Sequence, residues 1–109
     1  MSRACFSPRA QRDLEDIWRF IANDNPAAAE TVRGAILDLA DRLQTNPEVG
    51  CMIRGTAKRH DNIRWVVIPR FRNYLLFYRP FRAGIVVVRV LHAARDWTRF
   101  FPRRDSRSQ

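Results

Sequence analysis

The chain has 109 residues, of which 46% are hydrophobic and 28% charged, and 20 Lys and Arg against 11 Asp and Glu give a net charge of +9. This length is enough for one domain with a core and too short for a doubly wound nucleotide-binding fold or a TIM barrel. The hydrophobic content excludes an intrinsically disordered protein. We therefore expect a single domain over residues 1–102 and a disordered basic tail over 103–109.

The positive charge is concentrated in the C-terminal half. Residues 1–54 carry a net charge of −1, whereas residues 55–109 carry +10. Clustered cations attract an acidic partner, either a nucleic acid or an acidic protein surface. The alternative is that the many arginines reflect amino-acid usage and are simply solvated.

The sequence lacks the segments that direct a protein to a membrane or out of the cell, and its cysteines lack the spacing of a metal site. No segment reaches the roughly 20 consecutive apolar residues of a membrane-spanning helix, and the N-terminus lacks the apolar block of a signal peptide. We therefore expect a cytoplasmic protein that does not bind membranes. Cys5 and Cys51 lack the spacing of a disulfide framework or a zinc site, so we expect both to be small buried hydrophobic residues, with no metal and no cofactor.

Two amphipathic helices are predicted in the N-terminal half. Ser7-Pro8 has the pattern of an N-cap followed by a proline in the first turn, and apolar residues at helical spacing continue to about residue 22. Asn25-Pro26 repeats this pattern, and the second helix is expected to end near Asn46-Pro47. Because the turn between the helices is short, they should form an antiparallel hairpin.

The C-terminal half has the composition of β-strands. Short connections between apolar segments predict an antiparallel meander, to which residues 4–6 could add a short fourth strand, while Glu48 to Asn62 should form a loop. The expected strands are Ile63 to Ile68, Tyr74 to Arg79 and Ile85 to Leu91. The sequence thus predicts an α+β fold, in which the helical hairpin packs on a three- to four-stranded antiparallel sheet.

Both faces of the last predicted strand are apolar. Since the hairpin can cover only one face of the sheet, the second face should meet either a protein partner or the C-terminal segment with Trp97, Phe100 and Phe101. Strict alternation puts two sets of residues on opposite faces, namely Val86, Val88, Val90 and His92 on one and Ile85, Val87, Arg89 and Leu91 on the other.

The sequence contains no Gly-rich phosphate loop, no HExxH motif and no cysteine–histidine nucleophile pattern. A metal-free ribonuclease needs only a general base, a general acid and cations at the phosphate. His92 could serve such a site, and the arginines that could join it are Arg64, Arg72, Arg79, Arg89 and Arg95. Otherwise His92 is a packed histidine at a strand end.

Other candidates would bind a target or partner rather than catalyse a reaction. Arg70 and Arg72 lie at a predicted hairpin next to Tyr74, so two guanidinium groups should project at one end of the sheet, where they suit phosphate or carboxylate. Trp97 lies close to Arg95 and Arg99, a composition typical of interface hot spots. The candidate binding residues are Arg70, Arg72, Tyr74, Arg79, Arg89, His92, Arg95 and Trp97.

Several segments in this order resemble the ParE branch of the RelE/ParE toxin superfamily, over about residues 5–97. The N-terminal segments are FSP (6–8), AQRDLEDIWRFI (10–21), NPAAA (25–29) and LQTNPEVG (43–50). The C-terminal segments are YLLFYR (74–79) and VRVLHAARD (88–96). Within the last segment, His92 and Arg95 match signature positions of the ParE ending, without an assigned role.

The resemblance implies a toxin of a type II toxin–antitoxin pair, with a helical hairpin packed on an antiparallel sheet. It implies a cognate antitoxin, whose acidic C-terminal tail wraps the toxin in a hetero-oligomer. ParE-branch toxins stall DNA gyrase on cleaved DNA and are not known to catalyse a reaction themselves, so direct nucleic-acid contact would be secondary. RelE-branch toxins instead cut messenger RNA at the ribosome. Their lysine-rich site is poorly matched here, since Lys58 stands alone; in that alternative His92 and Arg95 would be catalytic.

Overall fold

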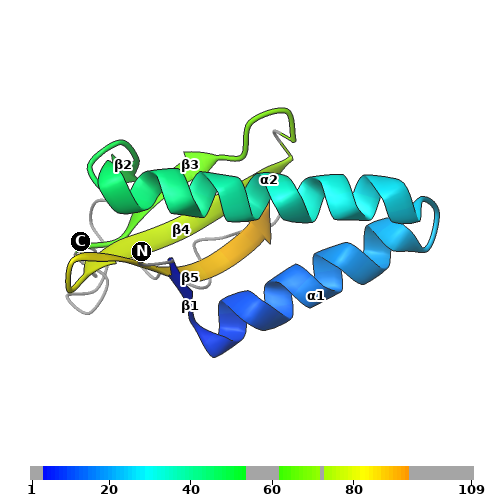
Figure 1. Ribbon diagram of the computed structural model, residues 1–109, viewed down its shortest axis with the longest axis horizontal. Helices are drawn as coiled ribbons and strands as arrows, with labels where there is room; N and C mark the ends of the chain where they lie inside the picture. Colours follow the sequence, from blue (N-terminus) through cyan, green and yellow to red (C-terminus); the bar gives the residue numbers. More distant parts are fainter. Residues whose placement is uncertain (1–3, 54–61, 72, 94–109) are drawn as a thin grey trace, which may run out of the picture.

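The computed structural model describes residues 4–53, 62–71 and 73–93, and both helices in this part of the chain lie on the same face of one sheet (Figure 1). The sheet has the strand order β1-β5-β4-β3-β2. In chain order the elements are β1 (Cys5–Phe6), α1 (Pro8–Ala22), α2 (Pro26–Thr45), β2 (Cys51–Met52), β3 (Arg64–Val67), β4 (Tyr74–Phe81) and β5 (Gly84–His92). The predicted α+β architecture is confirmed.

Both helices begin where their capping residues predict. The Ser7 side chain accepts a hydrogen bond from the Ala10 N–H at 3.0 Å, and the Asn25 side chain accepts one from the Ala28 N–H at 3.1 Å. A proline follows each cap in the first turn, where its missing N–H costs nothing. The antiparallel hairpin therefore arises from local signals at each helix start.

The main core lies between the hairpin and the sheet. In α2, apolar residues spaced by three and four positions turn one stripe toward the strands. Full burial of each large aliphatic side chain contributes about 1.5–3 kcal/mol. The fully or nearly fully buried residues of this core include Ala10, Val32, Ile36, Leu43, Leu76, Tyr78, Ile85, Val87 and Val90.

Gly34 interrupts α2 without a packing reason. A Cβ atom added at Gly34 would meet nothing within 4 Å, so alanine fits without strain. We expect Gly34→Ala to raise the free energy of unfolding by about 0.5–1 kcal/mol, because alanine loses less backbone entropy in a helix. The check is a higher urea midpoint at unchanged slope. Gly84→Ala is the contrasting control and should bring no such gain, since its Cβ would displace the Gln44 side chain. An unchanged urea midpoint in Gly34→Ala would contradict the prediction.

The sheet differs from the prediction at both edges. β1 pairs in parallel with β5, Cys5 lying opposite Val86, so the sheet is not wholly antiparallel. β2 lies inside the segment expected to be a loop and pairs with β3, which brings the number of strands to five. β4 also continues through Pro80 to Phe81, residues expected in the connection. Two-residue strands are too short to show alternation, and only pairing with a neighbour defines them.

A β-bulge changes the faces of β5. Phe77 pairs with Arg89 and Tyr78 with Val87, so Val88 is an extra residue on β5. Beyond it the alternation shifts by one, and Val90 joins the helix-facing core with Val87. Strict alternation along this strand was therefore a wrong prediction, because a bulge cannot be read from one strand's pattern.

The second face of the sheet carries its own apolar cluster. Its described members come from the strands and their connections, and none of them comes from a helix. The buried members are Ile53, Ile63, Leu75, Phe77 and Leu91, and Trp65 and Val88 pack against them. The C-terminal segment with Trp97, Phe100 and Phe101, expected as one cover of this face, lies outside the described residues, as does the predicted tail 103–109. Whether a protein partner or this segment covers the second face of the sheet therefore stays a prediction.

The two cysteines are exposed, contrary to the expectation that they are buried. Cys5 and Cys51 belong to the two-residue edge strands β1 and β2, where little of the chain covers them. Over the described ranges, no three His, Cys, Asp or Glu side chains gather as metal ligands would. Neither described helix combines the length and apolar character needed to cross a bilayer.

Candidate functional site

Tyr74 and His92 meet at the end of the sheet where β4 begins and β5 ends. They are register partners, and their rings lie edge to face, with centroids 5.2 Å apart and planes at 80°. Both side chains are half-buried, so each has an accessible part. The structure therefore brings together two of the predicted site residues, which lie 18 positions apart in the sequence.

The chemistry of this pair is limited by Tyr74. Its ring packs against the core between the hairpin and the sheet, and burial raises the pKa of its phenol from the ordinary value of 10.0. The phenol is therefore protonated at neutral pH. It can donate a hydrogen bond, but it cannot serve as a general base there.

Arg70 lies on the connection that leads into Tyr74. It is exposed and has a φ of 71°, in the left-handed region that a non-glycine residue seldom adopts. The connection is tied to the sheet by the Ile68 N–H, which donates to the Tyr74 carbonyl at 3.1 Å. Arg70 therefore lies on the connection next to Tyr74, where it lines a hollow together with Asp38 and Arg42 of α2. We call Arg70, Tyr74 and His92 the Tyr74–His92 end. The side chain of Arg72, and all of Arg95 and Trp97, lie outside the described residues.

Arg79 is distant from this end. It lies five residues along β4 from Tyr74, about 17 Å at the usual strand rise. Its exposed guanidinium lies 5.7 Å from the centroid of the Phe81 ring. If Arg79 contacts a partner, it does so at the opposite end of the sheet.

Arg89 has an internal role. Its Nε and Nη2 atoms donate to the two carboxylate oxygens of Asp13 at 2.7 and 3.0 Å, and both side chains are only 12% exposed. A guanidinium bound in this bidentate way is largely occupied by α1. The sequence marked Arg89 as a cation but held no local signal for its partner, which lies 76 positions away.

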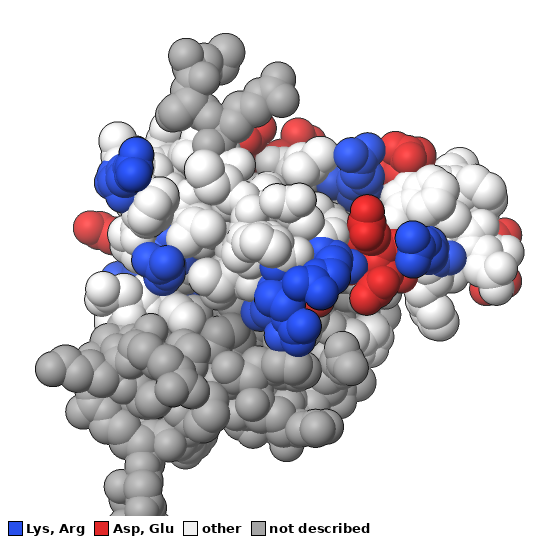
Figure 2. All heavy atoms as spheres, turned by 90° about the horizontal axis from the view of Figure 1, so that it is seen from below, with Lys and Arg blue, Asp and Glu red and all other residues white. Residues whose placement is uncertain are grey.

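The charge asymmetry of the sequence persists in the described part, where residues 4–53 carry −3 and residues 62–71 and 73–93 carry +5. Ten Lys and Arg and eight Asp and Glu lie there, so these residues carry +2 of the total charge of +9. Figure 2 shows basic and acidic side chains adjoining one another on the face seen from below. Residues outside the described ranges carry the other +7 of the net charge, of which the last 16 residues of the chain carry +3.

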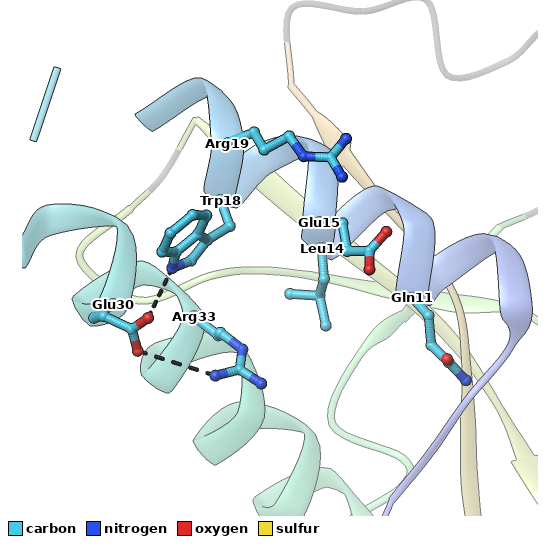
Figure 3. Close-up of a pocket in the computed structure, with 7 residues that line it drawn as sticks. All are labelled: Gln11, Leu14, Glu15, Trp18, Arg19, Glu30 and Arg33. Carbon is cyan, nitrogen blue, oxygen red and sulfur yellow. Dashed lines mark hydrogen bonds and ion pairs between the residues drawn. The ribbon is translucent and has the colours of Figure 1, made fainter. Parts of the chain in front are cut away.

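A hollow of about 570 Å³ lies between α1 and α2 (Figure 3). The Trp18 Nε1–H donates to Glu30 at 2.8 Å, and Glu30 also forms an ion pair with Arg33 at 4.0 Å. The sequence pattern of α1 carries no signal for this polar contact of Trp18 with Glu30, because the two residues belong to different helices. Trp18, Glu30 and Arg33 thus contact one another here, an arrangement that ties α1 to α2. The lining residues are Gln11, Leu14, Glu15, Trp18, Arg19, Glu30 and Arg33.

The family comparison decides what kind of protein this is. The model of the ParE toxin of the type II toxin–antitoxin system, parDE, matches residues 5–97. The chain belongs to the ParE toxin family. This ParE-family toxin is 29% identical over 87 residues to Toxin RelE3 of Caulobacter vibrioides, a match that covers 79% of this chain and 88% of the relative.

A solved structure of the chromosomal ParDE TA system from P. aeruginosa has the same fold. It superposes with a TM-score of 0.63 at 16% identity, over 84% of the ParE-family toxin and 96% of the solved chain. The resemblance seen in the sequence is thus confirmed, and the protein is a ParE-type toxin of a toxin–antitoxin system. The family match spans the Tyr74–His92 end as well as Arg95 and Trp97.

Proposed function

We propose that this ParE-family toxin inhibits DNA gyrase by binding it, without catalysing a reaction itself, and that a cognate antitoxin neutralises it. The observation that carries the proposal is the ParE family match over residues 5–97, nearly the whole domain. The match includes every candidate binding residue, from Arg70 to Trp97. Inhibition by binding requires a surface of suitable shape and charge, and it requires no acid–base pair.

The proposed gyrase contact is the Tyr74–His92 end together with its sequence neighbours Arg72, Arg95 and Trp97. Arg70 supplies an exposed planar cation that suits carboxylate or phosphate. Tyr74 and His92 add half-buried rings with polar atoms, a combination common in interface hot spots. Arg79 would extend the contact only for a partner that reaches the other end of β4.

The proposed antitoxin has an acidic C-terminal tail and forms a hetero-oligomer with the toxin. The net charge of +10 in residues 55–109 favours such a tail, and the relative of known structure belongs to a ParDE system. An acidic tail would contact the basic half of the toxin and compete there with the target.

A ribosome-dependent messenger endoribonuclease is the second candidate function, because the curated relative carries the name Toxin RelE3. In this mechanism His92 would act as general acid or base, and nearby arginines would stabilise the charge on the phosphate. Tyr74 would act only as a hydrogen-bond donor, since burial raises the pKa of its phenol. This function predicts that His92→Gln abolishes messenger cleavage while ribosome binding persists.

The test is a gyrase supercoiling assay with the full-length toxin released from its antitoxin and shown to be folded by circular dichroism. We expect loss of supercoiling and accumulation of linear cleaved DNA. Arg70→Ala, Arg72→Ala and Arg95→Ala should each raise the inhibitory concentration about tenfold or more, which corresponds to about 1.4 kcal/mol of binding energy. Arg33→Ala, an exposed arginine on α2, is the matched control and should inhibit normally.

Two results would count against the proposal. Full inhibition by all three arginine variants would remove the proposed contact surface. A folded toxin without effect on gyrase would contradict the proposed function itself. A translation-coupled cleavage assay with wild type and His92→Gln would then decide whether the ribosomal alternative holds.

A further inference from the structure

The β5 bulge is bonded to the start of α1. An extra residue in one strand leaves backbone groups without a partner in the ladder. Here the Ser7 N–H donates to the Val87 carbonyl at 2.9 Å, and the Ser7 hydroxyl donates to the Val88 carbonyl at 3.0 Å. Ser7 also caps α1 through Ala10, so one residue both starts the helix and bonds β5 at the bulge.

Asp13 completes this arrangement one and a half turns further along α1. Its carboxylate accepts the Val90 N–H at 3.0 Å and binds the Arg89 guanidinium through both oxygens. The rise from Ser7 to Asp13 along a helix is about 9 Å, and Val87 to Val90 spans about 10 Å of strand. The two distances match, so Ser7 and Asp13 together bond four consecutive residues of β5.

The bulge decides which way His92 faces. Without an extra residue, Tyr74 would pair with Leu91, and His92 would fall on the opposite face of the sheet. With it, Tyr74 pairs with His92 on the helix-facing side, and the rings touch. The last bond from α1 reaches Val90, two residues before His92.

We propose that Ser7 and Asp13 are positioning residues, which hold the β5 bulge and thereby set His92 against Tyr74. Their importance for toxicity rests on the proposed function, in which the Tyr74–His92 end contacts the target. Their effect on the ring contact does not depend on that function.

The test is proton NMR of the full-length toxin, in which two Tyr and two His make the aromatic signals tractable. Asp13→Ala and Ser7→Ala should weaken the nuclear Overhauser effect between the Tyr74 and His92 rings at least threefold. The Tyr78 ring to Gly50 amide effect should persist, because the Tyr78 hydroxyl accepts that N–H away from α1. Asp16→Asn changes an exposed acid of the same helix and should leave both signals unchanged.

Two further variants separate positioning from general stability. Asp13→Asn keeps the shape of the side chain and one acceptor oxygen, so it tests the contact if Asp13→Ala does not fold. Ile36→Val weakens the core without touching the bulge, since Ile36 is fully buried on α2. The ring contact should survive in Ile36→Val and weaken in Asp13→Asn at comparable thermal stability.

The outcomes distinguish this inference from the proposed function. Retention of the ring contact in Asp13→Asn and Ser7→Ala would overturn the inference, whatever gyrase does. Equal loss of the contact in Ile36→Val would also overturn it. Loss of the ring contact in Asp13→Asn and Ser7→Ala, but not in Ile36→Val, would support the inference. If Asp13→Asn and Ser7→Ala then still inhibited gyrase normally, that result would count only against the proposed target surface.

Discussion

Asp13→Ala is expected to lower the free energy of unfolding by about 3 kcal/mol, the lower end of the cost of breaking a buried ion pair from one side, because this pair is part-buried. The Asp13 and Arg89 side chains are each 12% exposed, so the charge left on Arg89 would be poorly solvated. The Val90 N–H would also lose its acceptor. Since small domains have about 5–15 kcal/mol of stability, this loss would be a large fraction of the total.

Urea unfolding followed by circular dichroism measures this loss. Asp16→Ala removes an exposed charge from the same helix and should change the free energy of unfolding by less than about 0.5 kcal/mol. The double variant Asp13→Ala, Arg89→Met should recover part of the loss, because no unpaired buried charge remains. A loss below about 1 kcal/mol in Asp13→Ala would mean that the pair behaves as a solvated surface ion pair.

Tyr78→Phe should lower the free energy of unfolding by about 2–3 kcal/mol, because it leaves a buried N–H unpaired. The Tyr78 side chain is fully buried, and its hydroxyl accepts the Gly50 N–H and donates to the Pro47 carbonyl, both at 2.8 Å. Burial also raises the pKa of Tyr78 from 10.0, so the hydroxyl keeps its proton at neutral pH and remains a donor. These bonds join the segment after α2 to the middle of the sheet.

Tyr74→Phe removes the same atom from a half-buried tyrosine and serves as the control, with an expected loss below about 1 kcal/mol in urea unfolding. Gly50→Ala probes the other side of the contact, since its Cβ would lie 2.6 Å from the Tyr78 Oη and 3.0 Å from the Trp65 carbonyl oxygen. The Gly50→Ala, Tyr78→Phe double variant should lose less than the sum of the two. Strict additivity would contradict a shared contact.

The sequence predicted which residue types form the candidate site, but it predicted little of how they are arranged in space. Tyr74 was expected to begin a strand and His92 to lie at a strand end, and β4 and β5 have them there. Arg89 looked equivalent to Arg70 and Arg79 in the sequence, but Asp13 binds it internally. A cation's partner depends on which element packs against it, and no pattern within β5 carries that information.

The features that follow from the sequence without the fold are local ones. Ser7-Pro8 and Asn25-Pro26 each combine a capping side chain with a proline in the first turn, so the two helix starts follow from a few neighbouring residues. The apolar spacing of α2 likewise marks the face that it buries.

The tertiary structure alone decided the edge strands, the exposure of the cysteines and the phase of β5. β1 and β2 have two residues each and exist only through their pairing with β5 and β3. The bulge at Val88 is bonded to Ser7, 81 positions away, and it reverses the faces of Val90 and His92. Alternation along a strand predicts which face of the sheet a side chain lies on only while every residue has a partner on the neighbouring strand. An extra residue, here hydrogen-bonded to Ser7 at the start of α1, shifts the alternation by one.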